Sequence, residues 1–189
     1  GTDSLNGKKI SVQGVGQVGM YLINYLVKEG AEISITDINT ERLAKVSADT
    51  GATIVGMNEI YDLDVDIYAP CAMGATLNDD TIGRLKANVI AGAANNQLED
   101  EARHGQMLVD AGMIYAPDFV INAGGIINIS GELAGAYNKE QAYSWTEKIY
   151  DTTQNIFALA DEKGIPTQDA AMKLAEKRIE DIGRVKLSM

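Results

Sequence analysis

The feature that most constrains the fold is a glycine-rich turn between a predicted strand and a predicted helix. Its sequence is Gly14-Val15-Gly16-Gln17-Val18-Gly19. In such a turn the first glycine permits the sharp change of direction, the second lets a pyrophosphate approach the backbone, and the third lets the helix pack close to the sheet. The free N–H groups and the positive end of the helix face the phosphates. The pattern therefore indicates a strand–turn–helix unit that binds a dinucleotide.

Hydrophobic patterning on both sides of the turn supports this interpretation. Residues 9–13 and 32–36 are short β-branched runs, which are typical of strands. Between them, Val18, Leu22 and Leu26 recur every four residues and so share one face of a helix. The three segments together predict a βαβ unit.

The rest of the chain predicts more units of the same kind, followed by a helical region. Further strands are expected near residue 54 and over 65–69, 88–91 and 113–116, and helices from about residue 40, from about residue 79 and over 99–111. Alternating strands and helices predict an α/β fold with a doubly wound, Rossmann-type parallel sheet. Two long amphipathic helices are expected over 139–162 and 168–182. We therefore expect a Rossmann domain over 1–138 and a C-terminal helical appendage over 139–189 that packs on it.

Charge and composition exclude several other classes of protein. The chain has 16 basic and 27 acidic residues and a net charge of −11, without a Lys/Arg cluster, which argues against nucleic acid or membrane as partners. No stretch approaches the roughly 18 apolar residues that cross a bilayer. Cys71 is the only cysteine and His104 the only histidine, so neither a disulfide nor a metal site is expected. A reducing, cytoplasmic compartment fits this composition best.

Asp37 is expected to select the cofactor. It follows the second strand, where a carboxylate accepts hydrogen bonds from the adenosine ribose hydroxyls and repels a 2′-phosphate. NADP sites usually place an arginine nearby, whereas here the nearest arginine, Arg42, is expected inside the next helix. The sequence therefore predicts NAD rather than NADP.

Three later segments follow predicted strands and are rich in small and amide side chains. They are residues 69–74, 91–97 and 121–125. Ligands collect at the carboxyl ends of the strands in an open parallel sheet, and amides can orient a nicotinamide or a substrate carboxylate. Glycine and asparagine are also common in ordinary turns, so the pattern alone leaves both interpretations open.

Extended segments of the chain resemble the Glu/Leu/Phe/Val amino-acid dehydrogenase family, most closely its leucine dehydrogenases. The resemblance is carried by residues 3–8, 12–16, 36–39 and 115–125 and covers essentially the whole chain. It implies oxidative deamination of an L-amino acid to a 2-oxo acid and ammonia, with hydride transfer to the nicotinamide.

The resemblance also implies roles for individual residues. Together with the glycine-rich turn, it assigns cofactor binding to Gly14, Val15, Gly16, Gln17, Val18, Gly19, Asp37, Ile38, Cys71, Ala72, Asn95 and Asn122. Asn96 matches a position that holds the substrate carboxylate, and Ile126 and Ile129 match positions that line an apolar substrate pocket. Because the isoleucines fall in a probable helix, packing in a core is the alternative role for them.

Family members also carry an amino-terminal domain that bears a catalytic lysine and an aspartate. No lysine of this chain lies in a matching context, so no catalytic residue is assigned and the chain alone is expected to bind NAD without turnover. Because the sequence starts at Gly1, we expect a piece trimmed from a longer protein, whose full-length form is expected to be a homo-oligomer. The missing domain is then a partner, and apolar surface on the terminal helices should be exposed.

Two alternatives remain open from the sequence. Residues 72–74 and 94–96 resemble phenylalanine dehydrogenases, whereas residues 121–128 resemble leucine dehydrogenases, so a branched-chain substrate is favoured over phenylalanine without excluding it. A non-catalytic NAD-sensing Rossmann module would need the glycine-rich turn and Asp37 but no substrate-facing loops. The amide-rich loops favour the enzyme.

Overall fold

The computed structural model describes residues 3–133, 135 and 137–187, and its side chains as far as residue 183. Two compact units make up the chain, Gly1–Asn122 and Ala123–Met189. The division falls before the boundary at residue 138 expected from the sequence, because helix α6 (Gly124–Leu133) packs against α7 (Lys139–Lys163) in the second unit. How the helical region packs on the Rossmann domain stays a prediction.

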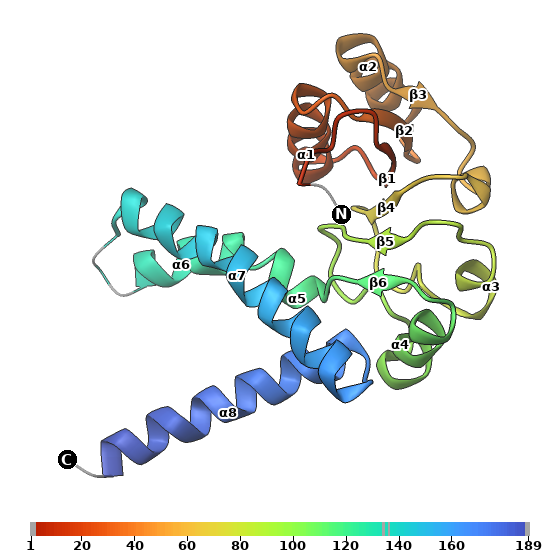
Figure 1. Ribbon diagram of the computed structural model, residues 1–189. Coiled ribbons are helices and arrows are strands. Elements are labelled where there is room, and N and C mark those ends of the chain that lie inside the picture. The colour runs from red at the N-terminus through yellow and green to blue at the C-terminus, as the bar shows by residue number, and fades with distance from the viewer. Residues whose placement is uncertain (1–2, 134, 136, 188–189) are drawn as a thin grey trace. The chain divides into compact units, whose positions relative to one another are not determined.

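The first unit contains a parallel sheet, which confirms the predicted doubly wound fold (Figure 1). In the described residues its strands are β1 (Lys9–Gln13), β2 (Glu32–Thr36), β3 (Thr53–Ile54), β4 (Ile67–Pro70), β5 (Val89–Ile90) and β6 (Ile114–Tyr115). The spatial order is β3-β2-β1-β4-β5-β6, and every pair is parallel. Strands β2 and β3 are added on one side of β1, and strands β4 to β6 are added on its other side. A crevice for a ligand forms at such a switch point, here between β1 and β4.

Helices connect the strands in the order that the sequence predicts, and two short helical segments, at residues 59–62 and 118–121, were not expected. The helical segments of this unit are α1 (Gln17–Lys28), α2 (Thr40–Thr50), the 3-10 helix η1 (Glu59–Asp62), α3 (Asp79–Ile82), α4 (Glu101–Asp110) and α5 (Asp118–Ile121). The helix expected from residue 79 is only one turn long, with an Asn78 capping box at its start and Gly83 at its end. A single turn such as α5 has no detectable sequence periodicity.

Apolar side chains cover both faces of the sheet, as β4 illustrates. Ala69 is buried in a cluster formed by residues of β1, β2, α1 and α2. Tyr68, its neighbour in the strand, points to the other face and is buried among residues of η1, α3 and α4. Successive residues of a strand point to opposite faces, so this alternation shows that β4 is covered on both sides.

A buried hydrogen-bond network lies at the carboxyl end of β1. The Gln13 amide donates to the Tyr61 hydroxyl at 2.7 Å and accepts from the Tyr68 hydroxyl at 2.6 Å. Burial raises the pKa of Tyr68, so its hydroxyl keeps its proton and donates. Because Gln13 directly precedes Gly14, the network holds the last residue of the strand in a fixed orientation before the glycine-rich turn.

His104 is buried, although the sequence placed it in a polar helix. Its side chain is 2% exposed, Nδ1 accepts a hydrogen bond from the Asp100 backbone N–H at 2.9 Å, and Nε2 lies 3.3 Å from Asp79 Oδ1. Partners at both ring nitrogens offset the cost of burying a polar ring. His104 therefore ties the start of α4 to α3.

The second unit confirms the two long C-terminal helices. α7 is capped by Asn138 and ends at Gly164, whose φ of 61° is left-handed, and α8 (Thr167–Leu187) packs against it. Large apolar side chains remain exposed on this unit, as expected; they include Ile126, Ile129, Leu133, Tyr143, Tyr150, Ile179 and Ile182. None of the described helices is both long and apolar enough to cross a membrane.

Substituting Gly19 by alanine should destabilise the first unit. A Cβ at Gly19 would lie 2.1 Å from the Gly14 carbonyl oxygen, so the backbone must shift. We expect Gly19→Ala to lower the free energy of unfolding in urea by about 2 kcal/mol or more. Gly16→Ala is the matched control, because no atom lies within 4 Å of its added Cβ and its φ is −64°. It should change stability by less than about 0.5 kcal/mol; equal losses for both variants would contradict the packing argument.

Candidate dinucleotide-binding site

The glycine-rich turn brings β1 close to the loop after β4. Gly14 has a φ of +102°, which a residue with a side chain rarely adopts, and a Cβ at this position would lie 2.7 Å from Ala72 Cβ. Its N–H donates to the Thr36 carbonyl at 2.8 Å, which fixes the turn against the end of β2. Only glycine fits between these neighbours.

The start of α1 leaves room for a phosphate group. Gly16 is the N-cap residue and, having no side chain, it cannot cap the N–H groups of the first helical turn. A Cβ at Gly16 would meet no atom within 4 Å. Open space in front of uncapped N–H groups fits the pyrophosphate of a dinucleotide.

The Asp37 carboxylate is held at the end of β2 by three donors. Its Oδ2 accepts from the Val15 N–H at 2.7 Å, and its Oδ1 accepts from the Asn39 N–H at 2.8 Å. Arg42 Nη2 donates to Oδ1 at 3.1 Å. Burial pushes the pKa of Asp37 upward, but the hydrogen bonds from Asn39, Val15 and Arg42 outweigh it and the pKa is lowered. The carboxylate is therefore charged at neutral pH and fixed beside the glycine-rich turn.

Arg42 lies within α2 as expected, but its guanidinium nevertheless reaches the Asp37 carboxylate. Asn39 caps α2 by accepting a hydrogen bond from the Arg42 N–H at 2.9 Å, which places Arg42 in the first turn of the helix. From there the guanidinium extends back to Asp37 and forms an ion pair. Assignment to the next helix was a poor guide because a long side chain in a first helical turn can reach back to a residue two positions before the cap.

The loops after β4 and β5 meet beside the turn. The Cys71 N–H donates to the Gln13 carbonyl at 2.7 Å, and Cys71 Sγ accepts from the Ala93 N–H at 3.5 Å. A Cβ at Gly74 would lie 2.7 Å from the Asn96 carbonyl oxygen. The structure thus brings Cys71 and Ala72 next to the loop that carries Asn95 and Asn96.

Two amide side chains from different loops also meet at this edge. Asn122 follows α5, and its Nδ2 donates to Asn95 Oδ1. Asn96 has a φ of +51°, a left-handed conformation that asparagine tolerates better than most residues. The Asn95–Asn122 contact places two assigned residues side by side at the carboxyl ends of β5 and β6.

Gln97 and Asp118 hold these loops in place, and sequence reasoning missed both. Gln97 is fully buried and its Nε2 donates to the Gly92 and Ala94 carbonyls at 2.8 and 2.9 Å. Asp118 is 6% exposed and its Oδ2 accepts from the Gln97 N–H at 2.8 Å. A polar residue in a short loop gives no sequence signal of burial, because its partners are backbone groups of other segments.

The two predicted substrate-pocket residues lie in the second unit. Ile126 and Ile129 belong to α6 and are 70% and 52% exposed, so neither packs in a core in this structure. Their exposure leaves them available to an apolar ligand. Their position relative to Asn96 stays a prediction.

The chemistry of the remaining candidates is limited. Burial raises the pKa of the Cys71 thiol, which keeps it protonated and unsuited to nucleophilic attack. In the part of the chain that the structure describes, no three His, Cys, Asp or Glu residues group in a way that could hold a metal ion.

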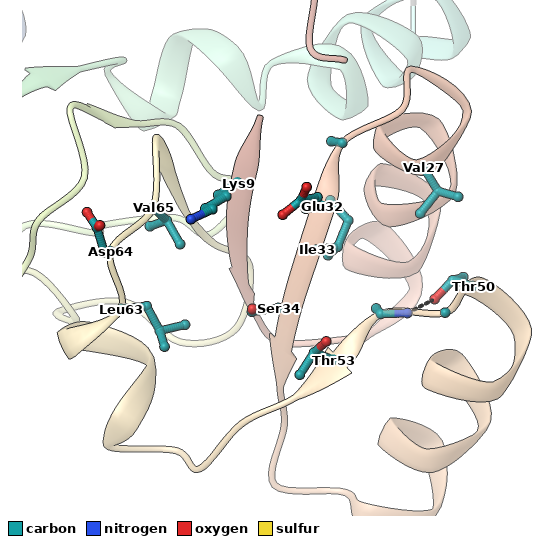
Figure 2. A pocket seen from close by; sticks show the side chains of 13 residues that line it. Lys9, Val27, Glu32, Ile33, Ser34, Thr50, Thr53, Leu63, Asp64 and Val65 are labelled. Atoms are coloured by element: carbon teal, nitrogen blue, oxygen red, sulfur yellow. Dashed lines mark hydrogen bonds between the residues drawn. The ribbon is translucent and has the colours of Figure 1, made fainter. Parts of the chain in front are cut away.

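A separate hollow lies near the amino-terminal ends of β1, β2 and β3 (Figure 2). It has a volume of about 460 Å³ and is lined by the first residues of three strands, Lys9, Glu32 and Thr53, and by Asp64. The glycine-rich turn and Asp37 follow the last residues of β1 and β2 instead. This hollow is therefore not part of the candidate site.

The fold is close to that of a Rossmann-like dehydrogenase domain. A doubly wound parallel sheet carries a glycine-rich turn at the switch point and a charged carboxylate at the end of β2. The family model for glutamate/leucine/phenylalanine/valine dehydrogenases matches residues 33–185, and the chain belongs to this family. Its members are dehydrogenases that use a nicotinamide cofactor.

Individual relatives act on different amino acids. The chain is 52% identical to leucine dehydrogenase from Bacillus cereus over 179 residues, which are 95% of this chain and 48% of that protein. It is 48% identical to L-tryptophan dehydrogenase from Nostoc punctiforme over 182 residues, 96% of this chain and 51% of that protein. The crystal structure of the latter enzyme matches with a TM-score of 0.94, covering 97% of this chain and 55% of that one. The chain thus spans about half the length of the curated relatives it matches.

Removing the Asp118 carboxylate should destabilise the first unit. Its oxygens accept from the backbone N–H groups of Gln97 and Phe119, and Asp118→Ala would leave both donors without this partner. We expect a loss of about 2 kcal/mol in the free energy of unfolding, measured by urea denaturation followed by circular dichroism. Asp110→Ala removes an exposed carboxylate that bonds Gln106 within α4 and should cost less than about 0.5 kcal/mol. A loss for Asp118→Ala no larger than for the control would show that the carboxylate is not needed.

Proposed function

We propose that the chain is the NAD-binding domain of an L-amino-acid dehydrogenase that deaminates a branched-chain, leucine-type substrate to a 2-oxo acid and ammonia. The observation that carries the proposal is the charged Asp37 carboxylate fixed by the Val15 N–H at the open glycine-rich turn. Carboxylate and turn together offer partners for the ribose and the pyrophosphate of one dinucleotide.

The residues present fit this cofactor. The backbone of residues 14–19 holds the pyrophosphate, since Gly16 leaves space in front of the N–H groups of α1. Asp37 accepts from the adenosine ribose, and Ile38, which is 78% exposed, offers an apolar surface next to it. Cys71, Ala72, Asn95 and Asn122 line the nicotinamide end. When bound, NAD supplies the acceptor for the substrate hydride.

The substrate assignment combines a polar and an apolar group. In this proposal Asn96 holds the substrate carboxylate, and the hydrogen bonds of Gln97 and Asp118 that fix its loop support the role. Ile126 and Ile129 offer exposed apolar side chains, which suit a branched aliphatic substrate. The similarity to a leucine dehydrogenase favours this substrate, although an L-tryptophan dehydrogenase is nearly as similar.

The acid and base groups of the reaction come from outside this domain. Of the carboxyl and thiol groups described at the site, Asp37 binds the ribose with a lowered pKa, and Asp118 is engaged with backbone N–H groups. Cys71 keeps its proton because burial raises its pKa. None is suited to exchange a proton with the substrate at neutral pH. We infer that the chain alone binds NAD without turnover and that the intact protein supplies a catalytic domain.

Calorimetric titration of the chain with NAD and NADP tests the cofactor assignment. NAD should bind at least tenfold more tightly than NADP, because Asp37 attracts ribose hydroxyls and repels a 2′-phosphate. Asp37→Ala should remove this preference, and Gly16→Ala should weaken NAD binding because its methyl group enters the space for the pyrophosphate. Asp49→Ala removes an exposed carboxylate from α2 and should leave the NAD to NADP ratio unchanged. Failure of the unmodified chain to bind NAD would refute the proposal.

Joining the chain to the amino-terminal half of the Bacillus cereus leucine dehydrogenase tests the enzymatic assignment. The fusion should reduce NAD with L-leucine and should prefer it over L-phenylalanine at least tenfold in kcat/KM, whereas the chain alone should show no turnover. Turnover by the chain alone would contradict the inference about the catalytic groups. A folded fusion that binds NAD and oxidises no amino acid would favour an NAD-sensing module instead.

A further inference from the structure

The hydrogen bonds of Asp37 leave its carboxylate partly occupied. A carboxylate offers about four acceptor positions, two on each oxygen. Oδ1 already accepts from the Asn39 N–H and from Arg42 Nη2, and Oδ2 accepts from the Val15 N–H. One position therefore remains, on Oδ2. A ribose that donates one hydroxyl to each oxygen also needs an open position on Oδ1.

Arg42 is the donor that can give up its position. The Val15 and Asn39 donors are backbone N–H groups and are fixed by the turn and by the cap of α2. The Arg42 side chain is 45% exposed, whereas the Asp37 side chain is 7% exposed. Because the guanidinium is partly exposed, water can take over as its hydrogen-bond partner when it moves off Oδ1, and the two backbone donors still hold the carboxylate. Arg42 thus competes with the ribose diol for the same oxygen.

A 2′-phosphate changes this competition. A guanidinium has five N–H donors, and among the described residues Arg42 uses one of them, on Asp37. Guanidinium groups bind phosphate in a bidentate way, so a phosphate on the ribose 2′ position would give the displaced Arg42 a new partner. A plain ribose diol offers no such partner. Arg42 can therefore support nucleotides that carry a 2′-phosphate, while its effect on a plain ribose diol stays small because the guanidinium can move aside.

We propose that Arg42 is a second specificity-determining residue of the adenosine-ribose subsite, which recognises a 2′-phosphate and so offsets the exclusion of NADP by Asp37. The inference rests on the proposed binding of NAD at this turn. The preference of the chain for NAD is then smaller than Asp37 alone would give, and the Asp37–Arg42 pair sets it. Within this pair, Asp37 selects the diol and Arg42 selects the phosphate.

Calorimetric titrations of the chain with NAD, NADP, AMP and adenosine 2′,5′-bisphosphate test the proposal. The last two probes differ only in the 2′-phosphate and so isolate the subsite. Arg42→Ala should weaken binding of the bisphosphate and of NADP at least tenfold while changing the affinity for NAD and AMP by less than threefold. Arg42→Lys, which keeps the charge but lacks the forked donor, should give an intermediate loss.

A control variant, Lys45→Ala, and a double variant built on Asp37→Ala complete the test. Lys45→Ala removes an exposed positive charge one turn further along α2 and should leave the ratio of the affinities within twofold. If NADP binds the unmodified chain too weakly to measure, Asp37→Ala should make its binding measurable, and adding Arg42→Ala should then abolish that gain.

Other outcomes overturn the inference in distinguishable ways. Equal effects of Arg42→Ala on NAD and NADP would assign Arg42 a purely structural role as a clamp on Asp37. A bisphosphate affinity that does not respond to Arg42→Ala, or a failure of Asp37→Ala to admit NADP, would also overturn it while leaving NAD binding intact. If the unmodified chain binds neither NAD nor AMP, the proposed function itself fails.

Discussion

The close approach of backbone segments at the β1–α1 turn is the constraint on which the site depends. Gly14 lies against Ala72, and the Gly14 carbonyl lies against Gly19, with no room for a side chain at either glycine. This contact places the start of α1 directly above the switch point between β1 and β4. It also brings the Val15 N–H to the Asp37 carboxylate, so one piece of backbone geometry fixes both groups that we propose to bind the dinucleotide.

Buried polar side chains fix the neighbouring strand end and loops of the site in the same way as the glycine contacts fix the turn. Gln13, between Tyr61 and Tyr68, holds the end of β1, and Gln97 and Asp118 hold the loop after β5. Gln13 bonds two tyrosine side chains, whereas Gln97 and Asp118 bond backbone groups of the loops, and burial makes the loss of any of these partners costly. The amide groups of Asn95 and Asn96 can therefore be presented to a ligand on a rigid support.

Much of the fold was predictable because its signals are local. The glycine pattern, the β-branched runs and the helical spacing of Val18, Leu22 and Leu26 depend on neighbours in sequence, and β1, β2 and α1 lie where these signals place them. The one-turn helices α3 and α5 were mis-sized or missed, since a single turn has no periodicity. The burial of His104 was missed because its partner Asp79 lies on another helix.

The amino-acid sequence by itself determined the fold class, the dinucleotide turn and the acidic residue that follows β2, because each follows from the conformational preferences of short segments. Tertiary structure decided which side chains share the carboxylate of Asp37, which residues support the amide loops and where the two units divide. Arg42 shows the physical reason. A long side chain ends several ångströms from its own backbone, so the charge beside Asp37 is set by the path of α2 in space and not by the distance between the two residues in the sequence.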